Sequence, residues 1–231
     1  TGRDALYEAA LEKLVAADSI FYCDCTRKKL RAETGPYAGY CRARRHCAYR
    51  PATAQEPASH AIRFDTSGLA PVTFQDRILG AQQFDLQALG DFIVRRRDSL
   101  FAYQLAVVVD DAEQAVTDIV RGADLLDSTP WQIALQRVLG LATPRYAHLP
   151  LLVHAKDAAK LSKQTGATAL DDRQAPANLL RALAQLGQSL PWLPGAGATR
   201  APLPGPAEIL AQAVRTWDCQ RIPQHAIIAG T

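Results

Sequence analysis

The chain has 231 residues, of which 48% are hydrophobic, and its formal net charge is +3 at pH 7. This length allows a sizeable core, as one large domain or as a domain with a smaller one. No apolar run approaches the roughly 18 residues that a membrane-spanning helix needs, and TGRDALYEAA has neither the basic start nor the apolar centre of a signal peptide. We therefore expect a cytoplasmic protein with no membrane partner.

The first part of the chain is predicted to be a helix followed by β structure. Residues 4–17 have apolar side chains at helical spacing, with Asp4 as the expected N-cap. Short β-like runs separated by Gly, Pro and polar residues follow at 19–23, 60–65, 71–76 and 91–97. The segment 19–98 is therefore expected to be rich in strands.

The middle of the chain alternates between predicted helices and strands. The order is helix, strand, helix, strand, at 100–111, 116–122, 128–140 and 145–153. Ser128 or Thr129 is expected to cap the second of these helices, with Pro130 in its first turn. Such alternation indicates a parallel α/β unit. Two further helices are predicted at 176–187 and 206–217, joined by a linker rich in Pro and Gly.

A cysteine cluster is the strongest local chemical signal. Five cysteines, an odd number, fit a reducing compartment better than a disulfide framework. Cys23 and Cys25 form a C-x-C pair after a predicted strand, and Cys41 returns after a loop rich in turn residues. Three thiolates are a credible Zn²⁺ site, but zinc requires four ligands. Spacing does not choose between nearby candidates for the fourth ligand, nor does it exclude three buried thiols without a metal. His46 and Cys47 lie just beyond Cys41 and could serve, whereas Tyr37 and Tyr40 lie within the loop, but tyrosine is a rare ligand that spacing cannot nominate.

Arg121 is a candidate ligand contact. Arg121 is at the C-terminal end of the predicted strand 116–122, where ligands bind in open α/β sheets. Its planar guanidinium can hold a carboxylate with two hydrogen bonds. A structural ion pair with Asp118 or Asp124 explains Arg121 equally well. Tyr103 lies on an otherwise apolar helix stripe, which indicates a core aromatic with a satisfied hydroxyl.

Three lysines, Lys156, Lys160 and Lys163, lie in HAKDAAKLSKQTG directly after the apolar run LPLLV. The sequence contains no P-loop and no G-x-G-x-x-G motif, so a phosphate ligand needs another cradle. These ammonium groups can provide it.

The order of these motifs resembles that of the class I glutamyl-tRNA synthetases. Residues 92–140, followed by 148–164, are similar to the second half of their catalytic core, with KLSK in place of the KMSKS loop. YCDCTRKKL and GPYAGYC look like the short paralogues, the glutamyl-Q tRNA(Asp) synthetases. The resemblance covers nearly the whole chain. It implies an α/β fold: a partial Rossmann-type core with a β-rich, zinc-containing insertion and a C-terminal helical region.

The resemblance also implies a reaction, namely ATP-dependent activation of glutamate and its transfer to queuosine in the anticodon of tRNA(Asp). The residues that contact glutamate fall on Tyr103 and Arg121, and the lysine that contacts ATP falls on Lys163. We assign the main catalytic role to Lys163 and an auxiliary one to Lys160. ATP is expected to act together with Mg²⁺. We also expect one structural Zn²⁺ per chain and a monomeric enzyme. The zinc ligands of the family fall on Cys23, Cys25, Tyr37 and Cys41.

The chain departs from the family pattern at its start, because the HIGH-type motif is not found. We expect the first third of the family's catalytic core to be missing, so that this chain alone lacks part of the machinery. The expected segments are a remnant of the first half of the core, the zinc-containing insertion, the second half of the core with its KMSKS-like loop, and a helical region, at 1–18, 19–98, 99–165 and 166–231.

Two other functions fit the sequence. The first is an enzyme of the same class that charges the 3′ end of a tRNA, which an additional C-terminal domain would distinguish. The second is a zinc-containing RNA-binding module without catalysis, which the missing HIGH motif favours. Basic residues in TRKKLR and CRARRH fit an RNA partner in each case, although the small net charge does not demand one.

Overall fold

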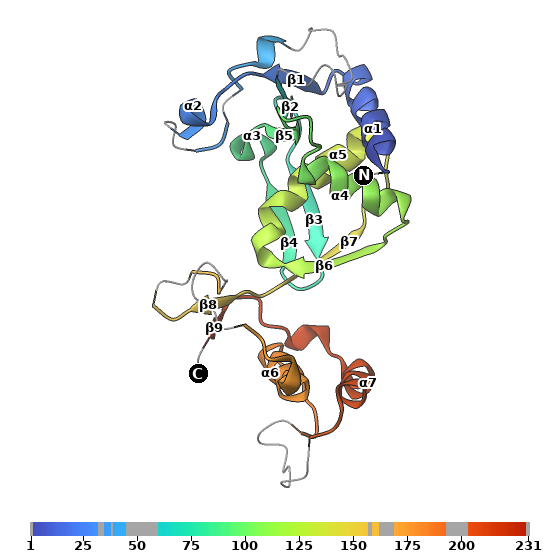
Figure 1. Ribbon diagram of the computed structural model, residues 1–231, viewed down its shortest axis with the longest axis vertical. Coiled ribbons are helices and arrows are strands. Elements are labelled where there is room, and N and C mark those ends of the chain that lie inside the picture. Colours follow the sequence, from blue (N-terminus) through green and yellow to red (C-terminus); the bar gives the residue numbers. More distant parts are fainter. Residues whose placement is uncertain are drawn as a thin grey trace. The chain divides into compact units, whose positions relative to one another are not determined.

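The computed structural model divides the chain into two compact units (Figure 1), and each is described by itself. The first consists of Thr1–Gln75, Ala81–Ile119 and Leu125–Tyr146, and the second of Asp76–Gly80, Val120–Asp124 and Ala147–Thr231. The residues that the structure describes are 2–31, 35–37, 39–44, 60–156, 159–161, 169–192 and 203–229. Within these ranges, no helix is both long and apolar enough to cross a membrane.

The first unit contains a three-stranded antiparallel sheet. Its strand order is β1-β2-β5, with β1 at Ile20–Cys23, β2 at Ala61–Phe64 and β5 at Phe92–Arg95. Ile20 pairs with Phe64 and Cys23 with Ala61, so the end of β1 carries the first cysteine to the edge of the unit's core. The sheet confirms three of the predicted β-like runs. Two short helices, α2 at Arg27–Arg31 and α3 at Leu86–Leu89, were not predicted.

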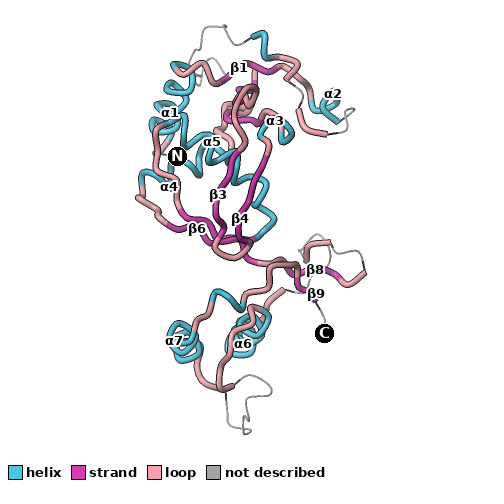
Figure 2. The backbone as a smooth tube through the Cα atoms, turned by 180° about the vertical axis from the view of Figure 1, so that it is seen from behind, coloured by secondary structure: helices cyan, strands magenta, loops and turns pink. Residues whose placement is uncertain are grey.

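Three helices pack on one another in the first unit, as Figures 1 and 2 both show: α1 at Asp4–Ala16, α4 at Tyr103–Glu113 and α5 at Thr129–Leu139. Their apolar faces and the sheet enclose one core. Burying a side chain such as leucine stabilises the fold by about 1.5 to 3 kcal/mol. The buried residues include Leu11, Leu14, Phe64, Leu105 and Ile133.

The predicted helix caps are partly wrong. Helix α1 has Arg3, not Asp4, at its N-cap, because the Arg3 carbonyl already accepts the backbone N–H of Leu6. Arg3 is held there by an ion pair of 2.7 Å with Asp110 on α4. For α5, Ser128 is the N-cap as predicted, but its hydroxyl accepts a hydrogen bond from the Gln104 amide instead of capping the backbone.

A second sheet has the strand order β4-β3-β7-β6. Its strands are β3 at Val72–Asp76, β4 at Gly80–Phe84, β6 at Asp118–Gly122 and β7 at Arg145–Leu149. Three residues join β3 to its neighbour β4, which requires an antiparallel pair, whereas β6 reaches its neighbour β7 through α5, the connection of parallel strands. The sheet is therefore mixed, and the predicted alternation of strand and helix is confirmed.

The second unit combines a small sheet with two helices. Strand β8 at Leu152–His154 pairs in parallel with β9 at Ile227–Ala229. Helices α6 at Ala175–Gln185 and α7 at Pro206–Thr216 confirm the two predicted helices, and they lie side by side. The buried cluster between these helices and the segment after α6 consists of Leu180, Leu183, Leu190, Ile209 and Ala213. Short 3₁₀ helices occur at Arg42–Arg44, Ala123–Ser128, Asp172–Gln174 and Cys219–Arg221.

The predicted strand 145–153 is in fact two strands, β7 and β8. Pro150 lies between them and has no backbone N–H to donate to a neighbouring strand, so the pairing is interrupted there. Strands β4 and β9 were missed. The sequence of β4, GAQQF, has no alternation of apolar residues, and β9 has only three residues.

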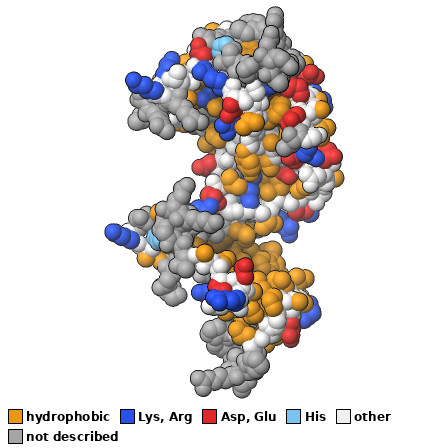
Figure 3. Space-filling view, viewed as in Figure 1, with side chains coloured by type: hydrophobic (Ala, Val, Ile, Leu, Met, Phe, Trp, Pro, Cys, Tyr) orange, Lys and Arg blue, Asp and Glu red, His pale blue; other side chains and the backbone are white. Residues whose placement is uncertain are grey.

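Helix α7 presents an apolar stripe to solvent. Leu210, Val214 and Trp217 are exposed and follow one another at helical spacing. Figure 3 shows hydrophobic side chains gathered over this helical part of the second unit.

Candidate functional site

The three predicted cysteine ligands come together in the first unit. The sulfur atoms of Cys23, Cys25 and Cys41 all lie within 4.8 Å of one another, and the Cys25 and Cys41 sulfurs are 3.6 Å apart. The phenolic oxygen of Tyr37 lies 3.6 Å from the Cys23 sulfur and 3.9 Å from the Cys25 sulfur. All three cysteines are free thiols. Strand β1 positions Cys23, and the loop after α2 brings Tyr37 and Cys41 back to it.

These spacings fit a tetrahedral metal ion. With zinc–sulfur bonds of about 2.3 Å, neighbouring ligand atoms of a tetrahedral site lie about 3.8 Å apart. The Cys25–Cys41 and Cys23–Tyr37 separations of 3.6 Å and the Cys25–Tyr37 separation of 3.9 Å are close to that value, and the other sulfur pairs lie within 4.8 Å. A disulfide would need sulfurs about 2.0 Å apart. Among the other candidates for the fourth ligand, the ring of Tyr40 packs edge-on against Tyr37, whereas His46 and Cys47 lie outside the described residues.

A buried cation accompanies the cluster. The guanidinium carbon of Arg63 lies 3.9 Å from the centre of the Tyr37 ring, and its Nη1 donates to the carbonyl of Asp91 at 2.8 Å. Burial alone would raise the pKa of the Cys23 thiol, but its hydrogen bonds with Tyr37 and Arg63 hold that pKa below its ordinary value. Burial raises the pKa of Cys25 to about 11. Arg63 can therefore offset negative charge on a cluster of thiolates.

The loop that carries Tyr37 is fixed from outside by Asp91. This carboxylate accepts two hydrogen bonds from Arg42, at 3.0 and 2.9 Å, and others from the backbone N–H and the hydroxyl of Thr66. The preceding residue, Gly90, ends α3 with φ at +77°. A β-carbon at Gly90 would lie 2.9 Å from the backbone oxygen of Tyr37, so only glycine allows this close approach.

We expect Gly90→Ala to destabilise the cysteine site, because the added methyl group must displace the Tyr37 backbone. Gly68→Ala is the matched control, since Gly68 also has a positive φ, +74°, but meets no atom within 4 Å. Both variants lose stability because alanine is strained at a positive φ, by about 1 to 3 kcal/mol at Gly90, where ψ is 171°. Thermal unfolding should show a larger loss for Gly90→Ala, together with weaker zinc retention, and equal losses would contradict the expected clash.

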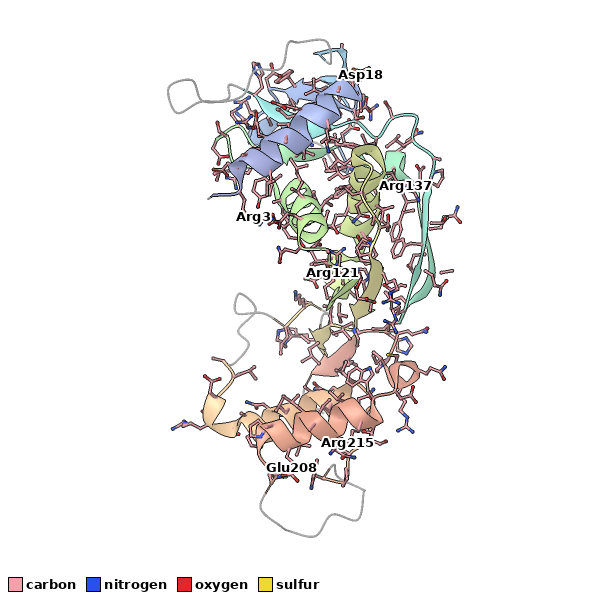
Figure 4. All side chains as sticks on the ribbon, turned by 90° about the vertical axis from the view of Figure 1, so that its right-hand side faces the viewer. Arg3, Asp18, Arg121, Arg137, Glu208 and Arg215 are labelled. Atoms are coloured by element: carbon pink, nitrogen blue, oxygen red, sulfur yellow. The ribbon has the colours of Figure 1, made fainter. Side chains whose placement is uncertain are left out.

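Arg121 lies in the second unit at the end of β6 (Figure 4) and takes part in a buried hydrogen-bonded series. Its Nε donates to Nε2 of His148 at 3.1 Å, and Nδ1 of His148 lies 2.6 Å from a carboxylate oxygen of Asp76. The His148 side chain is 0% exposed, as is that of Asp76. The sequence interpretation missed both residues. A sequence signal was available for both residues. Asp76 ends the strand β3, and His148 is a polar residue within the predicted strand 145–153.

The electrostatics of this series keep His148 neutral and Asp76 ionised. Burial lowers the pKa of His148 below its ordinary value. Burial would raise the pKa of Asp76, but hydrogen bonds from the backbone N–H of Leu79 and from His148 hold it lower. The Asp76 carboxylate, the neutral His148 imidazole and the Arg121 guanidinium thus follow one another along one line of hydrogen bonds.

Asp118 and Asp124, the alternative partners of Arg121 considered from the sequence, each lie beside another cation. Asp118 forms an ion pair of 2.6 Å with Arg145. Asp124 accepts a hydrogen bond from the ammonium of Lys160 at 2.5 Å, which lowers the pKa of Asp124. Lys160 is therefore held in the same unit as Arg121, close to the end of β6.

The remaining predicted residues are placed as follows. Tyr103 opens α4 in the first unit and is 51% exposed, so the interpretation as a core aromatic is wrong. Lys156 is exposed at the end of β8. Lys163 lies outside the described residues.

Comparison with known proteins places the chain in a family. The model of tRNA synthetases class I (E and Q), catalytic domain, matches residues 1–190. The chain is 48% identical over 223 residues to the glutamyl-Q tRNA(Asp) synthetase of Methylococcus capsulatus, covering 96% of this chain and 68% of that protein. It is 45% identical over 224 residues to the enzyme of the same name from Pseudomonas aeruginosa, with coverage of 96% and 70%.

A solved structure shares the fold. The glutamate-tRNA synthetase of Elizabethkingia anophelis superposes with a TM-score of 0.70 at 18% identity, covering 99% of this chain and 51% of that chain. This chain thus spans about half the length of that synthetase. At such low identity, the likeness shows the fold alone.

The fold and the family match define a class I tRNA synthetase catalytic domain, a ligase-type enzyme of a class that uses ATP. Within that class, the chain belongs to the family of the glutamyl-Q tRNA(Asp) synthetases.

Proposed function

We propose that this protein activates glutamate with ATP and transfers it to queuosine in the anticodon of tRNA(Asp). The names of its relatives support the substrate. The observation that carries the proposal is the guanidinium of Arg121, held at the end of β6 by the buried His148. A rigid guanidinium at the end of a sheet strand is suited to a carboxylate substrate.

The proposed roles follow from the chemistry of activation. Arg121 and Tyr103 hold the polar groups of glutamate, so that its α-carboxylate meets the α-phosphorus of ATP in line. Negative charge then develops on the α-phosphate and the leaving pyrophosphate. The ammonium of Lys163, assisted by Lys160 and by Mg²⁺ on ATP, neutralises this charge mainly in the transition state.

We propose a structural role for zinc at the cysteine cluster. The thiolates of Cys23, Cys25 and Cys41, with the oxygen of Tyr37, would hold one Zn²⁺, and the matched ligand separations support this assignment. Four protein ligands leave no open position for water, so the ion would staple the loop to β1 and take no part in the chemistry.

The RNA partner is proposed from the charge beside this cluster. Lys28 and Lys29 are exposed on α2, directly after the C-x-C pair. Exposed cations of this kind contact phosphates, while the unstacked bases of an anticodon loop can enter a cleft.

We also propose a division of the chain into four segments: a core remnant at 1–18, a zinc-containing insertion at 19–98, the second half of the core at 99–165 and a helical region at 166–231. The protein is proposed to be a monomer.

We expect the full-length gene product to attach labelled glutamate to tRNA(Asp) that carries queuosine. The same tRNA without queuosine, and tRNA(Glu), should stay unlabelled, because the acceptor is the modified base and not the 3′ end. The measurement is acid-precipitated label after incubation with ATP. Labelling of tRNA(Glu) alone, or equal labelling of both forms of tRNA(Asp), would favour charging of the 3′ end. No labelling of any RNA would favour a binding module without catalysis.

A further inference from the structure

We propose that Asp76 and His148 are positioning residues that fix the guanidinium of Arg121 for a carboxylate substrate. The inference rests on the proposed role of Arg121 as the glutamate contact and deepens it. It assigns a function to two buried polar residues that the proposed reaction does not otherwise use. All three residues lie in the second unit.

The direction of each hydrogen bond follows from Arg121. A guanidinium has only donors, so Nε2 of His148, 3.1 Å from Nε of Arg121, must be the acceptor. The proton of the neutral imidazole is then on Nδ1, which donates to the Asp76 carboxylate at 2.6 Å. Only one of the two imidazole tautomers satisfies both contacts.

Asp76 is itself held rigidly at the end of β3. Its Oδ1 accepts the backbone N–H groups of Ile78 and Leu79, each at 2.9 Å, and that of His148 at 3.3 Å. The other oxygen, Oδ2, faces the imidazole. Because the side chains of Asp76 and His148 are fully buried, these hydrogen bonds act in a medium of low dielectric and strongly restrict the imidazole ring.

The series also determines how Arg121 can bind a carboxylate. Its Nε–H is directed at His148, so a grip with two parallel hydrogen bonds has to use the two Nη groups. A substrate carboxylate would therefore meet the guanidinium end-on. Loss of the acceptor at Nε2 would let the guanidinium turn and would weaken this geometry.

We call the hydrogen-bonded series of Asp76, His148 and Arg121 the relay. Asp76→Asn tests this relay with little change in the shape of the side chain. The amide oxygen of asparagine can keep the backbone hydrogen bonds that Oδ1 accepts, while its NH₂ takes the place of Oδ2 and faces His148 as a donor. Nδ1 must then become an acceptor and the proton moves to Nε2, where it opposes the Nε–H of Arg121. The substitution thus inverts the tautomer and sets two donors against each other.

The first measurement is the ¹⁵N spectrum of the His148 ring, which distinguishes the tautomers without any assay of activity. The wild-type protein should carry its proton on Nδ1 and the Asp76→Asn variant on Nε2. The wild-type spectrum tests the relay even where the variant fails to fold, because a proton on Nε2 of the wild-type ring would overturn it.

The second measurement is glutamate-dependent exchange of pyrophosphate into ATP by the full-length gene product. Asp76→Asn should raise the KM for glutamate by about tenfold to a hundredfold, because a buried donor loses its acceptor, with kcat and the KM for ATP changed far less. A purely structural defect would not be confined to the KM for glutamate but would also lower kcat and raise the KM for ATP. In an Arg121→Lys background, which lacks Nε–H, Asp76→Asn should add less than about threefold.

The outcomes separate the relay from the proposed function. If Asp76→Asn left the KM for glutamate unchanged while Arg121→Ala raised it, the relay would be overturned. The proposed contact between Arg121 and glutamate would remain in place. An unchanged KM for glutamate in Arg121→Ala would overturn the proposed role of Arg121 itself. Full additivity of Asp76→Asn and Arg121→Lys would also overturn the relay.

Discussion

Replacing Cys41 with serine is expected to abolish zinc binding and to unfold the loop that holds Tyr37. The sulfur of Cys41 lies 3.6 Å from that of Cys25, and its backbone N–H donates to the Tyr37 oxygen at 3.0 Å. Structural zinc contributes about 10 to 16 kcal/mol of apparent binding free energy in small domains. Losing one of three thiolates should therefore remove the ion and lower the Tm. Elemental analysis of the purified protein and thermal unfolding measure both effects.

Cys219→Ser is the matched control for this prediction. Cys219 is an exposed free thiol in the second unit, where the Trp217 indole N–H donates to its sulfur at 3.2 Å. The control should keep one zinc ion per chain and nearly the wild-type Tm. Wild-type protein without zinc, or Cys41→Ser with unchanged zinc content and Tm, would refute the metal site.

Tyr37→Phe separates the fourth ligand from the three thiolates. Phenylalanine keeps the ring that stacks on Phe21 and lies over Arg63 but removes the oxygen. Weaker zinc retention than in the wild type would support oxygen ligation. Unchanged zinc affinity would assign the fourth position to another group.

The sequence predicted that the three cysteines come together, because they are close in the chain. The C-x-C pair on one strand and a loop of turn residues constrain where Cys41 can lie. The choice of Tyr37 among the nearby candidates required the resemblance to a family, since spacing alone did not select it. Arg63 was missed because it comes from β2, after a stretch with no recognisable pattern.

The relay behind Arg121 was not predictable in the same way. Asp76 and His148 are 72 residues apart in sequence, and only tertiary pairing brings them together. Local patterns encode helix faces and strand alternation but not which strands become neighbours. The break between β7 and β8 could have been predicted from local sequence, because proline cannot donate a backbone hydrogen bond within a sheet. The long apolar run around Pro150 favoured one continuous strand instead.

Arg121→Ala is expected to raise the KM for glutamate by about thirtyfold to a thousandfold in the full-length gene product. Losing such a charge-assisted contact costs about 2 to 4 kcal/mol. The effect should fall mainly on KM, because in the proposed mechanism Arg121 would contact the substrate before and during the reaction, whereas Lys163 would act on charge that develops in the transition state. Glutamate-dependent pyrophosphate exchange measures both constants.

Arg145→Ala is the control for Arg121→Ala, because Arg145 is an arginine of the neighbouring strand whose side chain is 68% exposed and pairs with Asp118. An exposed pair of this kind contributes at most about 1 kcal/mol to stability, so its removal should leave the KM for glutamate unchanged. If the two variants shifted that KM equally, the loss would reflect general damage to the strands. A shift confined to Arg121→Ala locates the carboxylate contact at the end of β6, on the guanidinium that His148 holds.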